Sequence, residues 1–567
     1  MDLEKLPRCY PSGPVPAKIL IVGEFPTAEE IHRKEPFVGA SGRVLTDILH
    51  ELDILRTECR LTNVSPWRPP RNDISKFFLT KTEATKNGFL PLGGKYPNQA
   101  LRQGLKELAI EVAKTQPEII IALGNTALWA LTSEWGITKW RGSALTLNPA
   151  WEQPYDPDIR VIATYNPLGI MRSWDWRPVA CYDISKAKEP KPKEPEWDWK
   201  ISTSFRSVMI QLYLLKRSLD QDKLSWIAAD IETRERTFVD CIGLAWSETE
   251  AICIPFFRAS DYSFLWTEEQ EAEIVLFLRE IFLHPRTKLI GQNWYYDAQY
   301  IARIWGIFPI PEFDTMVAHA VAYPGTPKSL DYLSSIYLPW HRYWKDDTAE
   351  AEAEADDNKR WEYNCKDCCA TWALREPIEQ TLRSQNLWQP WEFERDLFRP
   401  LMAMIMKGVR LHEKRRQEYL PLVLDQQADL ETFFQQVQAE AFPDLELAKT
   451  KTAKPWYRSP TQMVKLLYQH LHLPTQYHKK TKRPTTDEAA LAALMKKEPI
   501  FAPLFSLILD YRSLGVFLTT FLLMPMDRDR RWRTSYNPVG TETFRLNSKS
   551  DSFGMGGNLQ NIPTGDD

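Results

Sequence analysis

The sequence has few cysteines, no apolar segment at its N-terminus and no excess of charge of either sign. Its 8 cysteines are scattered over 567 residues, which favours reduced thiols in a cytoplasm over a disulfide framework. Residues 1–18 lack the apolar core of a signal peptide, so a secreted product is not expected. We find no apolar run long enough to span a bilayer, and therefore expect no membrane partner.

The charge balance neither requires nor excludes a nucleic acid partner. Lys and Arg total 71 against 75 Asp and Glu, a formal net charge of -4. Any DNA-binding surface must then be a local basic patch. The 22 tryptophans suit either large cores or base-stacking platforms, and composition does not choose between these.

The length of the chain predicts several domains. At roughly 150 residues per domain, 567 residues correspond to about three to four. A stretch of Lys, Glu and Pro at 187–200 predicts an extended linker. Before this linker, short apolar segments such as 17–24 and 118–124 predict buried parallel strands among helices. Three strand-like segments follow the linker, and long helical patterns dominate from about Trp391. The predicted fold class is therefore α/β and multidomain.

Acidic residues recur after the linker at spacings that suit a metal site. Asp230 and Glu232 lie two apart on a predicted strand, so both side chains project from one face. Asn293 and Asp297 lie four apart, which predicts one face of a helix. Oxygen ligands suit Mg²⁺ or Mn²⁺ rather than zinc. Two such ions can activate a water and stabilise the leaving oxygen of a phosphodiester.

A third pair, Tyr363 and Asp367, lies four apart on another predicted helix. Each pair alone is common in proteins as helix caps or polar surface residues, but three such pairs in this order and at these intervals are uncommon. With the segment FDTMVAHAVAYPGTPKSLDYLSSIYL they resemble the proofreading 3′→5′ exonuclease domain (DEDD superfamily, Y subtype) of family A DNA polymerases, over about residues 204–387. The cysteines of the C-x-x-C-C run between Cys365 and Cys369 are interpreted as buried thiols on a helix, a metal or redox site being the alternative.

This resemblance implies an RNase H-like domain that removes 3′-terminal nucleotides as monophosphates from single-stranded or frayed ends. It implies that Tyr363 orients the attacking water and that Asn293 supports the pocket for the DNA end. By the same resemblance two divalent ions, Mg²⁺ or Mn²⁺, would be held by Asp230, Glu232, Asp297 and Asp367.

The C-terminal part resembles the thumb and the first part of the palm of a family A DNA polymerase. The segment WRTSYNPVGTETFRLNSKSDSFGMGGNLQNIPTGDD carries this resemblance, which implies that Arg545, Gln560 and Asn561 contact DNA. Phe544 stands where the family usually has glycine. The family's polymerase carboxylates and fingers helix lie beyond N-L-Q-N-I-P, so we expect no polymerisation by this polypeptide alone. Either a second polypeptide completes the enzyme, or the sequence is a truncated piece of a longer one.

The N-terminal part, residues 18 to about 185, resembles the uracil-DNA glycosylase superfamily, closest to the branch that often carries an iron–sulfur cluster. The pieces that carry the resemblance are GEFPTAEE, EPFVGASGRVL, TNVSPWRPP, IIIALGNTAL and TYNPLGIMR. It implies that Glu24 lies in a water-activating loop, that Phe37 stacks on a flipped base and that Asn63 reads that base. Asn166 replaces the usual histidine and cannot carry positive charge. Trp67 occupies an expected cluster cysteine position, so no iron–sulfur cluster is predicted.

Together these features look like the N-terminal part of a replicative DNA polymerase of some large bacteriophages, with its own exonuclease. The alternatives are a base-excision repair enzyme and a non-catalytic DNA-binding subunit of a split polymerase. The expected partners are primer–template DNA, single-stranded 3′ ends and a second polypeptide. The expected location is the cytoplasm, that of the host if a phage encodes the chain. The predicted domains are a glycosylase-like α/β/α domain (1–186), the linker (187–200), the exonuclease (201–388), a helical thumb-like region (389–530) and the start of a palm (531–567).

Overall fold

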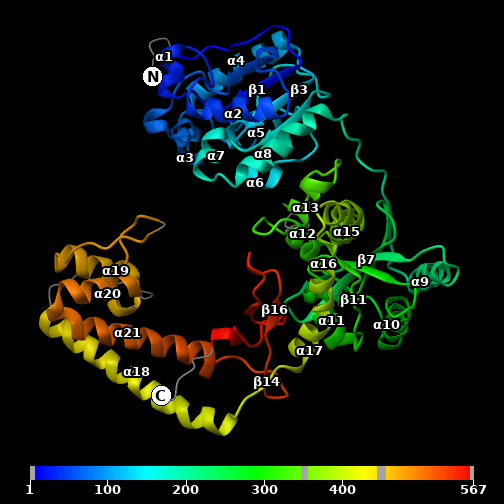
Figure 1. Cartoon of the computed structure of the whole chain (residues 1–567), viewed down its shortest axis with the longest axis vertical. Helices are drawn as coiled ribbons and strands as arrows, with labels where there is room; N and C mark the ends of the chain where they lie inside the picture. Colours follow the sequence, from blue (N-terminus) through cyan, green and yellow to red (C-terminus); the bar gives the residue numbers. More distant parts are fainter. Residues whose placement is uncertain (1–6, 347–355, 443–454, 480, 562–567) are drawn as a thin grey trace. The chain divides into compact units, whose positions relative to one another are not determined.

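A computed structural model describes residues 7–346, 356–442, 455–479 and 481–561 of the chain (Figure 1). The chain divides into two units, Met1–Asp396 and Leu397–Asp567. Among the described residues, the first unit contains two large sheets surrounded by helices and one small two-stranded sheet, and the second unit is mainly helical. This confirms the predicted α/β multidomain fold class, while the domain boundaries given above remain predictions.

The first sheet is parallel except at one edge, and its strand order is β2-β1-β3-β5-β4. Its strands are runs of branched apolar residues that are buried on both faces, as parallel strands between helical layers must be. Their carboxyl ends therefore meet along one edge, where loops leave the sheet. The strands are β1 (Ile19–Gly23), β2 (Cys59–Asn63), β3 (Ile119–Leu123), β4 (Leu145–Thr146) and β5 (Arg160–Thr164).

Eight described helices accompany this sheet, and all of them except α1 and α3 contribute apolar side chains to one hydrophobic core with the strands. Thr27 and Thr80 begin two of them with reciprocal capping boxes, which fix where those helices start. The helices are α1 (Ala28–Arg33), α2 (Ala40–Glu51), α3 (Lys81–Lys86), α4 (Gln99–Thr115), α5 (Asn125–Thr132), α6 (Ile137–Trp140), α7 (Pro167–Arg172) and α8 (Trp176–Ser185).

The second sheet has the order β13-β12-β7-β8-β9-β6, with β7 near its centre. The strands β7, β8 and β9 are antiparallel neighbours, and β12 joins β7 in parallel. The predicted linker ends in this sheet, because Asp198–Ile201 forms an edge strand paired with β9. The strands are β6 (Asp198–Ile201), β7 (Trp226–Arg234), β8 (Phe238–Ala245), β9 (Glu250–Pro255), β12 (Lys288–Gly291) and β13 (Phe313–Asp314), with a small hairpin of β10 (Phe257–Arg258) and β11 (Ser263–Phe264).

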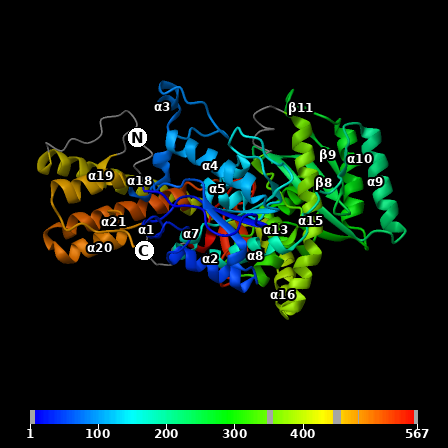
Figure 2. The same ribbon diagram turned by 90° about the horizontal axis from the view of Figure 1, so that it is seen from above.

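One long helix, α15, packs across β7, β8 and β9 and so brings its side chains to the middle of this sheet. Helices α9 and α10 lie side by side (Figure 2). The helices around this sheet are α9 (Phe205–Asp220), α10 (Glu268–Phe282), α11 (Tyr295–Trp305), α12 (Thr315–Ala322), α13 (Leu330–Tyr337), α15 (Asp357–Ser384) and α16 (Trp388–Asp396).

The second unit is built on long helices that share an aromatic core around Phe434, Trp456 and Phe505. Two short antiparallel pairs, β14 with β15 and β16 with β17, accompany them. The helices are α17 (Phe398–Lys407), α18 (Glu413–Ala441), α19 (Pro460–Val464), α20 (Glu488–Lys497) and α21 (Ala502–Phe517), and the strands are β14 (Val409–Arg410), β15 (Arg531–Trp532), β16 (Ser535–Asn537) and β17 (Asn547–Lys549).

The helical stretch Pro499–Leu522 corrects one expectation from the sequence, because by length and composition it could cross a membrane. Asp510 and Arg512 interrupt the apolar run of this stretch. Three of its side chains, Phe505, Ile508 and Tyr511, are buried in the core of the second unit. Core helices pass the same length and composition test, so a single such stretch is weak evidence for a membrane span.

His319 on α12 makes the stability of the first unit depend on pH. Its imidazole is 2% exposed, with Nδ1 3.1 Å from the Tyr337 hydroxyl and Nε2 2.9 Å from Thr326 Oγ1. Burial, assisted by nearby Lys328, lowers the pKa of His319 from 6.5 to about 4. The unfolded chain therefore binds more protons than the folded chain between about pH 6.5 and pH 4, and stability falls as pH falls through that window.

We expect His319→Gln to remove part of this acid sensitivity. The imidazole accounts for a loss of about 3 kcal/mol in the free energy of unfolding between pH 7 and pH 4, since one pKa unit is worth about 1.4 kcal/mol. Urea unfolding of the wild type and the variant at both pH values measures the difference. An equal pH dependence in the two proteins would contradict the assignment.

Candidate functional site

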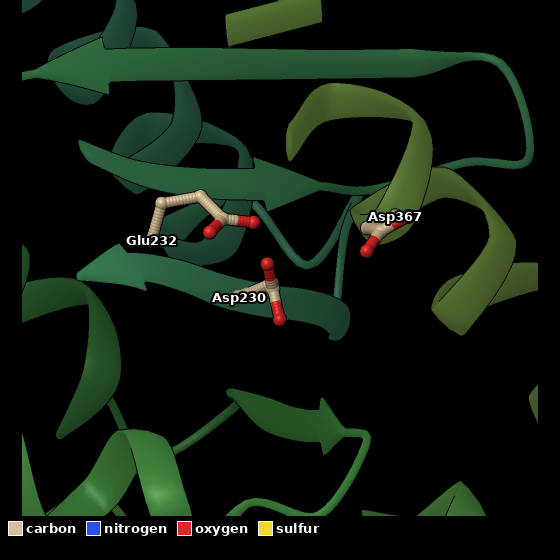
Figure 3. A group of neighbouring side chains, drawn as sticks. All are labelled: Asp230, Glu232 and Asp367. Carbon is tan, nitrogen blue, oxygen red and sulfur yellow. The ribbon is translucent and has the colours of Figure 1, made fainter. Parts of the chain in front are cut away.

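Three of the predicted carboxylates converge at the middle of the second sheet. Asp230 and Glu232 project from the same face of β7, and Asp367 reaches them from α15. One carboxylate oxygen of each lies within 4.8 Å of the others. Figure 3 shows the three carboxyl groups facing a common space between strand and helix.

The fourth predicted carboxylate, Asp297, lies beside this group. It is in the first turn of α11, is 4% exposed, and accepts a hydrogen bond of 3.0 Å from the backbone N–H of Ile231. Ile231 stands between Asp230 and Glu232 on β7, so this bond ties the start of α11 to the strand that carries the other acids.

The electrostatics of the cluster favour a bound cation. Burial, followed by repulsion from Asp297, Glu232 and Asp367, raises the pKa of Asp230 well above its usual value. Burial also raises the pKa of Glu232 to about 7 and that of Asp297 to about 8. Buried carboxylates resist ionisation unless positive charge is near. An all-oxygen set of this kind fits Mg²⁺ or Mn²⁺, whose charge would offset the repulsion.

Tyr363 and Asp367 occupy successive turns of α15, as the sequence predicts. The Tyr363 side chain hydrogen-bonds to Asp367 and favours its ionised form, although burial has the larger effect and raises the pKa of Asp367. Asn293 is placed differently from the prediction. Helix α11 begins at Tyr295, and Asn293 precedes it with a left-handed φ of 59°.

Asp314 is the physical reason for this difference. Its carboxylate accepts hydrogen bonds from the backbone N–H groups of Asn293 (3.2 Å) and Trp294 (2.8 Å), which turns the chain before the helix starts. Asn293 and Asp297 therefore do not share a helical face, and Asn293 stands half-buried in the turn that leads into α11.

Three residues that the sequence did not single out contact the acidic cluster. The Asn364 side chain donates a hydrogen bond of 3.0 Å to Asp230. The Trp344 indole Nε1–H donates one of 2.7 Å to Asp367, and Lys345 Nζ lies 3.9 Å from the same carboxylate. Asn364 could have been noticed beside Tyr363, whereas nothing in the local sequence marks Trp344 or Lys345.

The cysteines near the cluster are buried side chains with free thiols. Cys241 and Cys253 come from β8 and β9, and the C-x-x-C-C run lies on α15 against them. Burial raises the pKa of Cys253 and Cys368 well above the usual value, which disfavours reactive thiolates. These features support the interpretation as core thiols.

The N-terminal α/β domain brings two of its predicted residues together at the carboxyl ends of its strands. Glu24 follows β1 and accepts hydrogen bonds from the Thr126 N–H (3.0 Å) and hydroxyl (2.9 Å). Asn166, at the end of β5, donates to the same carboxylate at 3.1 Å while its own oxygen caps α7 through Leu168. The Glu24 carboxylate is thus held by three donors.

The side chains of the other two predicted residues of this domain, Phe37 and Asn63, both lie close to Gly23. A Cβ at Gly23 would come within 2.4 Å of Asn63 Oδ1 and 2.7 Å of the Phe37 ring, so only glycine leaves room for both. Phe37 is 8% exposed and has a left-handed φ of 56°. The indole of Trp67, at the expected cluster position, is buried with the Arg8 guanidinium 5.6 Å from its ring centre. A buried indole offers no thiolate, so the residues present do not fit an iron–sulfur cluster.

In the second unit, the predicted DNA contacts lie on one short stretch of chain. Arg545, Gln560 and Asn561 are all exposed. The Gln560 side chain donates 2.9 Å to the carbonyl of Leu546, so it already fixes the turn before β17. Phe544 has a left-handed φ of 56°, a conformation that glycine adopts without strain. Residues 562–567, with the end of N-L-Q-N-I-P, lie outside the described residues.

Comparisons with known families match three parts of the chain. Residues 10–192 match the uracil DNA glycosylase superfamily, residues 211–383 match a 3′-5′ exonuclease family, and residues 425–567 match DNA polymerase family A. The match to the exonuclease family contains the four predicted metal ligands, Asp230, Glu232, Asp297 and Asp367. The match to the glycosylase superfamily contains Glu24, Phe37, Asn63 and Asn166.

Two individual relatives, a glycosylase and a polymerase, agree with these matches. A type-4 uracil-DNA glycosylase of Thermotoga maritima is 30% identical over 186 residues, which are 32% of this chain and 82% of that protein. DNA polymerase I of Helicobacter pylori is 39% identical over 108 residues, 18% of this chain and only 10% of that protein. Among solved structures, the POL domain of Pol1 from M. smegmatis, in complex with DNA primer-template and dNTP, is similar with a TM-score of 0.46 and 20% identity, over 62% of this chain and 55% of that chain.

Proposed function

The chain belongs to the uracil-DNA glycosylase superfamily through its N-terminal domain and also carries 3′-5′ exonuclease and family A DNA polymerase domains, and from this premise we propose that it trims DNA 3′ ends during DNA synthesis. The proposed reaction is metal-dependent hydrolysis of the terminal phosphodiester, releasing nucleoside monophosphates. The observation that carries the proposal is the group formed by Asp230, Glu232 and Asp367, with oxygens within 4.8 Å of one another.

The side chains have distinct proposed tasks. Asp230, Glu232 and Asp367 would hold two divalent ions, Mg²⁺ or Mn²⁺, with Asp297 beside them. Such ions neutralise the attacking and leaving oxygens of an in-line displacement. Tyr363 would orient the attacking water, since its hydroxyl lies in the hydrogen-bond network of Asp367.

Asn293 would support the pocket for the DNA end, and Arg545, Gln560 and Asn561 would contact primer–template DNA. The roles of these four residues rest on the family matches rather than on observed contacts with DNA. Arg545 is the best placed of them for a phosphate, because its exposed guanidinium can pair with phosphate oxygens in the bidentate manner typical of arginine.

We expect Tyr363→Phe to lower kcat for 3′ trimming about tenfold to a hundredfold, while KM for DNA stays within about twofold. The hydroxyl would act on the water and not on the binding of DNA. Steady-state kinetics on 5′-labelled single-stranded DNA with Mg²⁺ measure both constants. Tyr323→Phe is the matched control, because its hydroxyl contacts Gln385 in the same domain. An unchanged kcat in Tyr363→Phe would remove the assigned role.

The type of polymerase to which the chain belongs, and the source of its remaining polymerase residues, are also proposals. The combination of a glycosylase-like domain with polymerase domains is the ground for proposing a phage-type polymerase that acts in the host cytoplasm. We propose that nucleotide addition needs palm and fingers residues outside this sequence, carried by a second polypeptide or by a longer chain. Extension of a primer by the purified chain alone would overturn that part of the proposal.

Recognition of a flipped base by the N-terminal domain is the second candidate function. It is favoured by the convergence of Glu24 and Asn166 at 3.1 Å and of Phe37 and Asn63 around Gly23. The contact between Asn166 and Glu24 counts against glycosylase activity. The neutral Asn166 amide offers no positive charge to a departing uracil anion, and it already donates a hydrogen bond to Glu24. We therefore place base binding ahead of base excision.

A further inference from the structure

A short segment of the first unit contacts both the N-terminal domain and the carboxylate cluster. We call this segment, residues 341–346, the strap. It lies in the described stretch between α13 and α15, the two helices of the second sheet's domain that flank it in the chain. None of its residues belongs to the motifs that identify the exonuclease.

The N-terminal domain holds the strap at several points. Tyr343 is 9% exposed and belongs to the hydrophobic core of the N-terminal domain, with its ring 5.4 Å from that of Trp140 in an edge-on contact. The Tyr343 N–H donates 3.2 Å to Ser143 Oγ. At the far end, Asp346 forms an ion pair of 2.9 Å with Lys139. These contacts fix the path of the strap from the N-terminal side.

The intervening residues of the strap face the carboxylates. Trp344 is 1% exposed, and its Nε1–H donates 2.7 Å to Asp367 Oδ1. Lys345 Nζ lies 3.9 Å from the other oxygen of the same carboxylate. The imidazole of His341 packs edge-on against the Trp344 ring at 5.3 Å, which fixes the indole plane. The Trp344 hydrogen bond thus orients the Asp367 carboxylate, and Lys345 places a positive charge beside its other oxygen.

We propose that the N-terminal domain positions the metal-site carboxylate Asp367 through the strap, so that metal binding depends on a domain of a different family. Trp344 is the positioning residue, and Lys345 sets the local charge. The inference deepens the proposed exonuclease function and rests on it for its catalytic consequence. The contacts themselves predict an effect on cation affinity whether or not the chain cleaves DNA.

The test measures Mn²⁺ binding to the full chain by electron paramagnetic resonance, together with kcat and KM for 3′ trimming. Trp344→Phe keeps the ring and removes the donor, and Lys139→Glu places two negative charges at the end of the strap. Loss of a group that orients a ligand typically lowers metal affinity or activity about 10–100-fold. We expect each variant to bind Mn²⁺ about tenfold more weakly and to lose about tenfold in kcat, with KM for DNA within about twofold.

Matched controls separate this effect from general damage. Trp372→Phe removes an indole N–H on α15 that has no hydrogen-bond partner among the described residues. Lys81→Glu makes the same charge change at an exposed position of α3, and neither control is expected to alter Mn²⁺ affinity. Lys345→Met should act in the opposite direction and bind Mn²⁺ about tenfold more tightly, because a fixed positive charge no longer repels the ion.

The outcomes are distinct. If Trp344→Phe and Lys139→Glu match their controls in Mn²⁺ affinity, the positioning role is overturned. If the wild type binds Mn²⁺ but trims no DNA, the proposed function fails, while the Mn²⁺ affinities of the variants still decide the role of the strap. If Asp230→Ala with Glu232→Ala binds Mn²⁺ as the wild type does, the cluster is not the metal site and both proposals are wrong.

Discussion

Replacing Asp230 and Glu232 together by alanine is expected to abolish Mg²⁺-dependent 3′ trimming, lowering its rate at least about a thousandfold. The two carboxylates come from one face of β7 and form two of the three members of the cluster. Without them the charge that develops on the attacking and leaving oxygens has no fixed cation opposite it, and several kcal/mol of transition-state stabilisation are lost. The rate on 5′-labelled single-stranded DNA measures the loss.

The double variant should still fold and bind DNA. In the absence of metal it should melt no earlier than the wild type, because burial and repulsion from neighbouring carboxylates already raise the pKa of both carboxyl groups. DNA binding, measured by fluorescence anisotropy in EDTA, should be largely unchanged. Asp261→Ala with Glu268→Ala removes two exposed carboxylates from the same domain and is the matched control. Retained trimming by Asp230→Ala with Glu232→Ala would remove the metal-site assignment.

The second large effect concerns stability, and it comes from the buried ion pair of Arg141 and Asp183. Their side chains are 1% and 0% exposed, and Arg141 Nε donates 2.8 Å to Asp183 while the Thr164 hydroxyl donates another 2.8 Å. Removing one partner of a buried pair leaves an uncompensated charge and costs about 3–5 kcal/mol. We expect Asp183→Ala to lower the free energy of unfolding of the first unit by that amount.

Urea unfolding followed by tryptophan fluorescence measures this loss. Glu118→Ala is the matched control, because its ion pair with Lys18 is exposed, at 67% and 82%, and such pairs contribute about 0–1 kcal/mol. Arg141 Nη1 also donates 2.7 Å to Ser335 Oγ on α13, so Asp183→Ala should also loosen the contact between the N-terminal domain and α13. A loss below about 1 kcal/mol in Asp183→Ala would contradict the account.

Local periodicity explains which parts of the site could be predicted from the sequence. Asp230 and Glu232 share a face because strand side chains alternate, and Tyr363 and Asp367 share a face because helical turns repeat. These rules act within one element, so the structure has both pairs as predicted. Asn293 was placed wrongly, since a carboxylate 21 residues further along the chain, Asp314, captures its backbone N–H before the helix begins.

Long-range contacts explain what the sequence could not provide. The strap reaches Asp367 from about 20 residues away in sequence and is held by a domain whose contacting residues lie about 200 residues earlier. No spacing rule connects such positions. Branched apolar runs bounded by turns mark buried strands, so the central strands could be predicted. The edge strand β6 could not, because it directly follows a stretch rich in Lys, Glu and Pro that predicts a linker.

One assay tests the central claim most directly. The purified chain is incubated with Mg²⁺ and a 5′-labelled primer–template that contains one uracil, with and without added nucleotides. The account predicts a descending ladder of products shortened from the 3′ end, without extension. Alkali-labile breakage at the uracil with intact 3′ ends would contradict it, because the N-terminal domain would then be the enzyme and the carboxylate cluster would not.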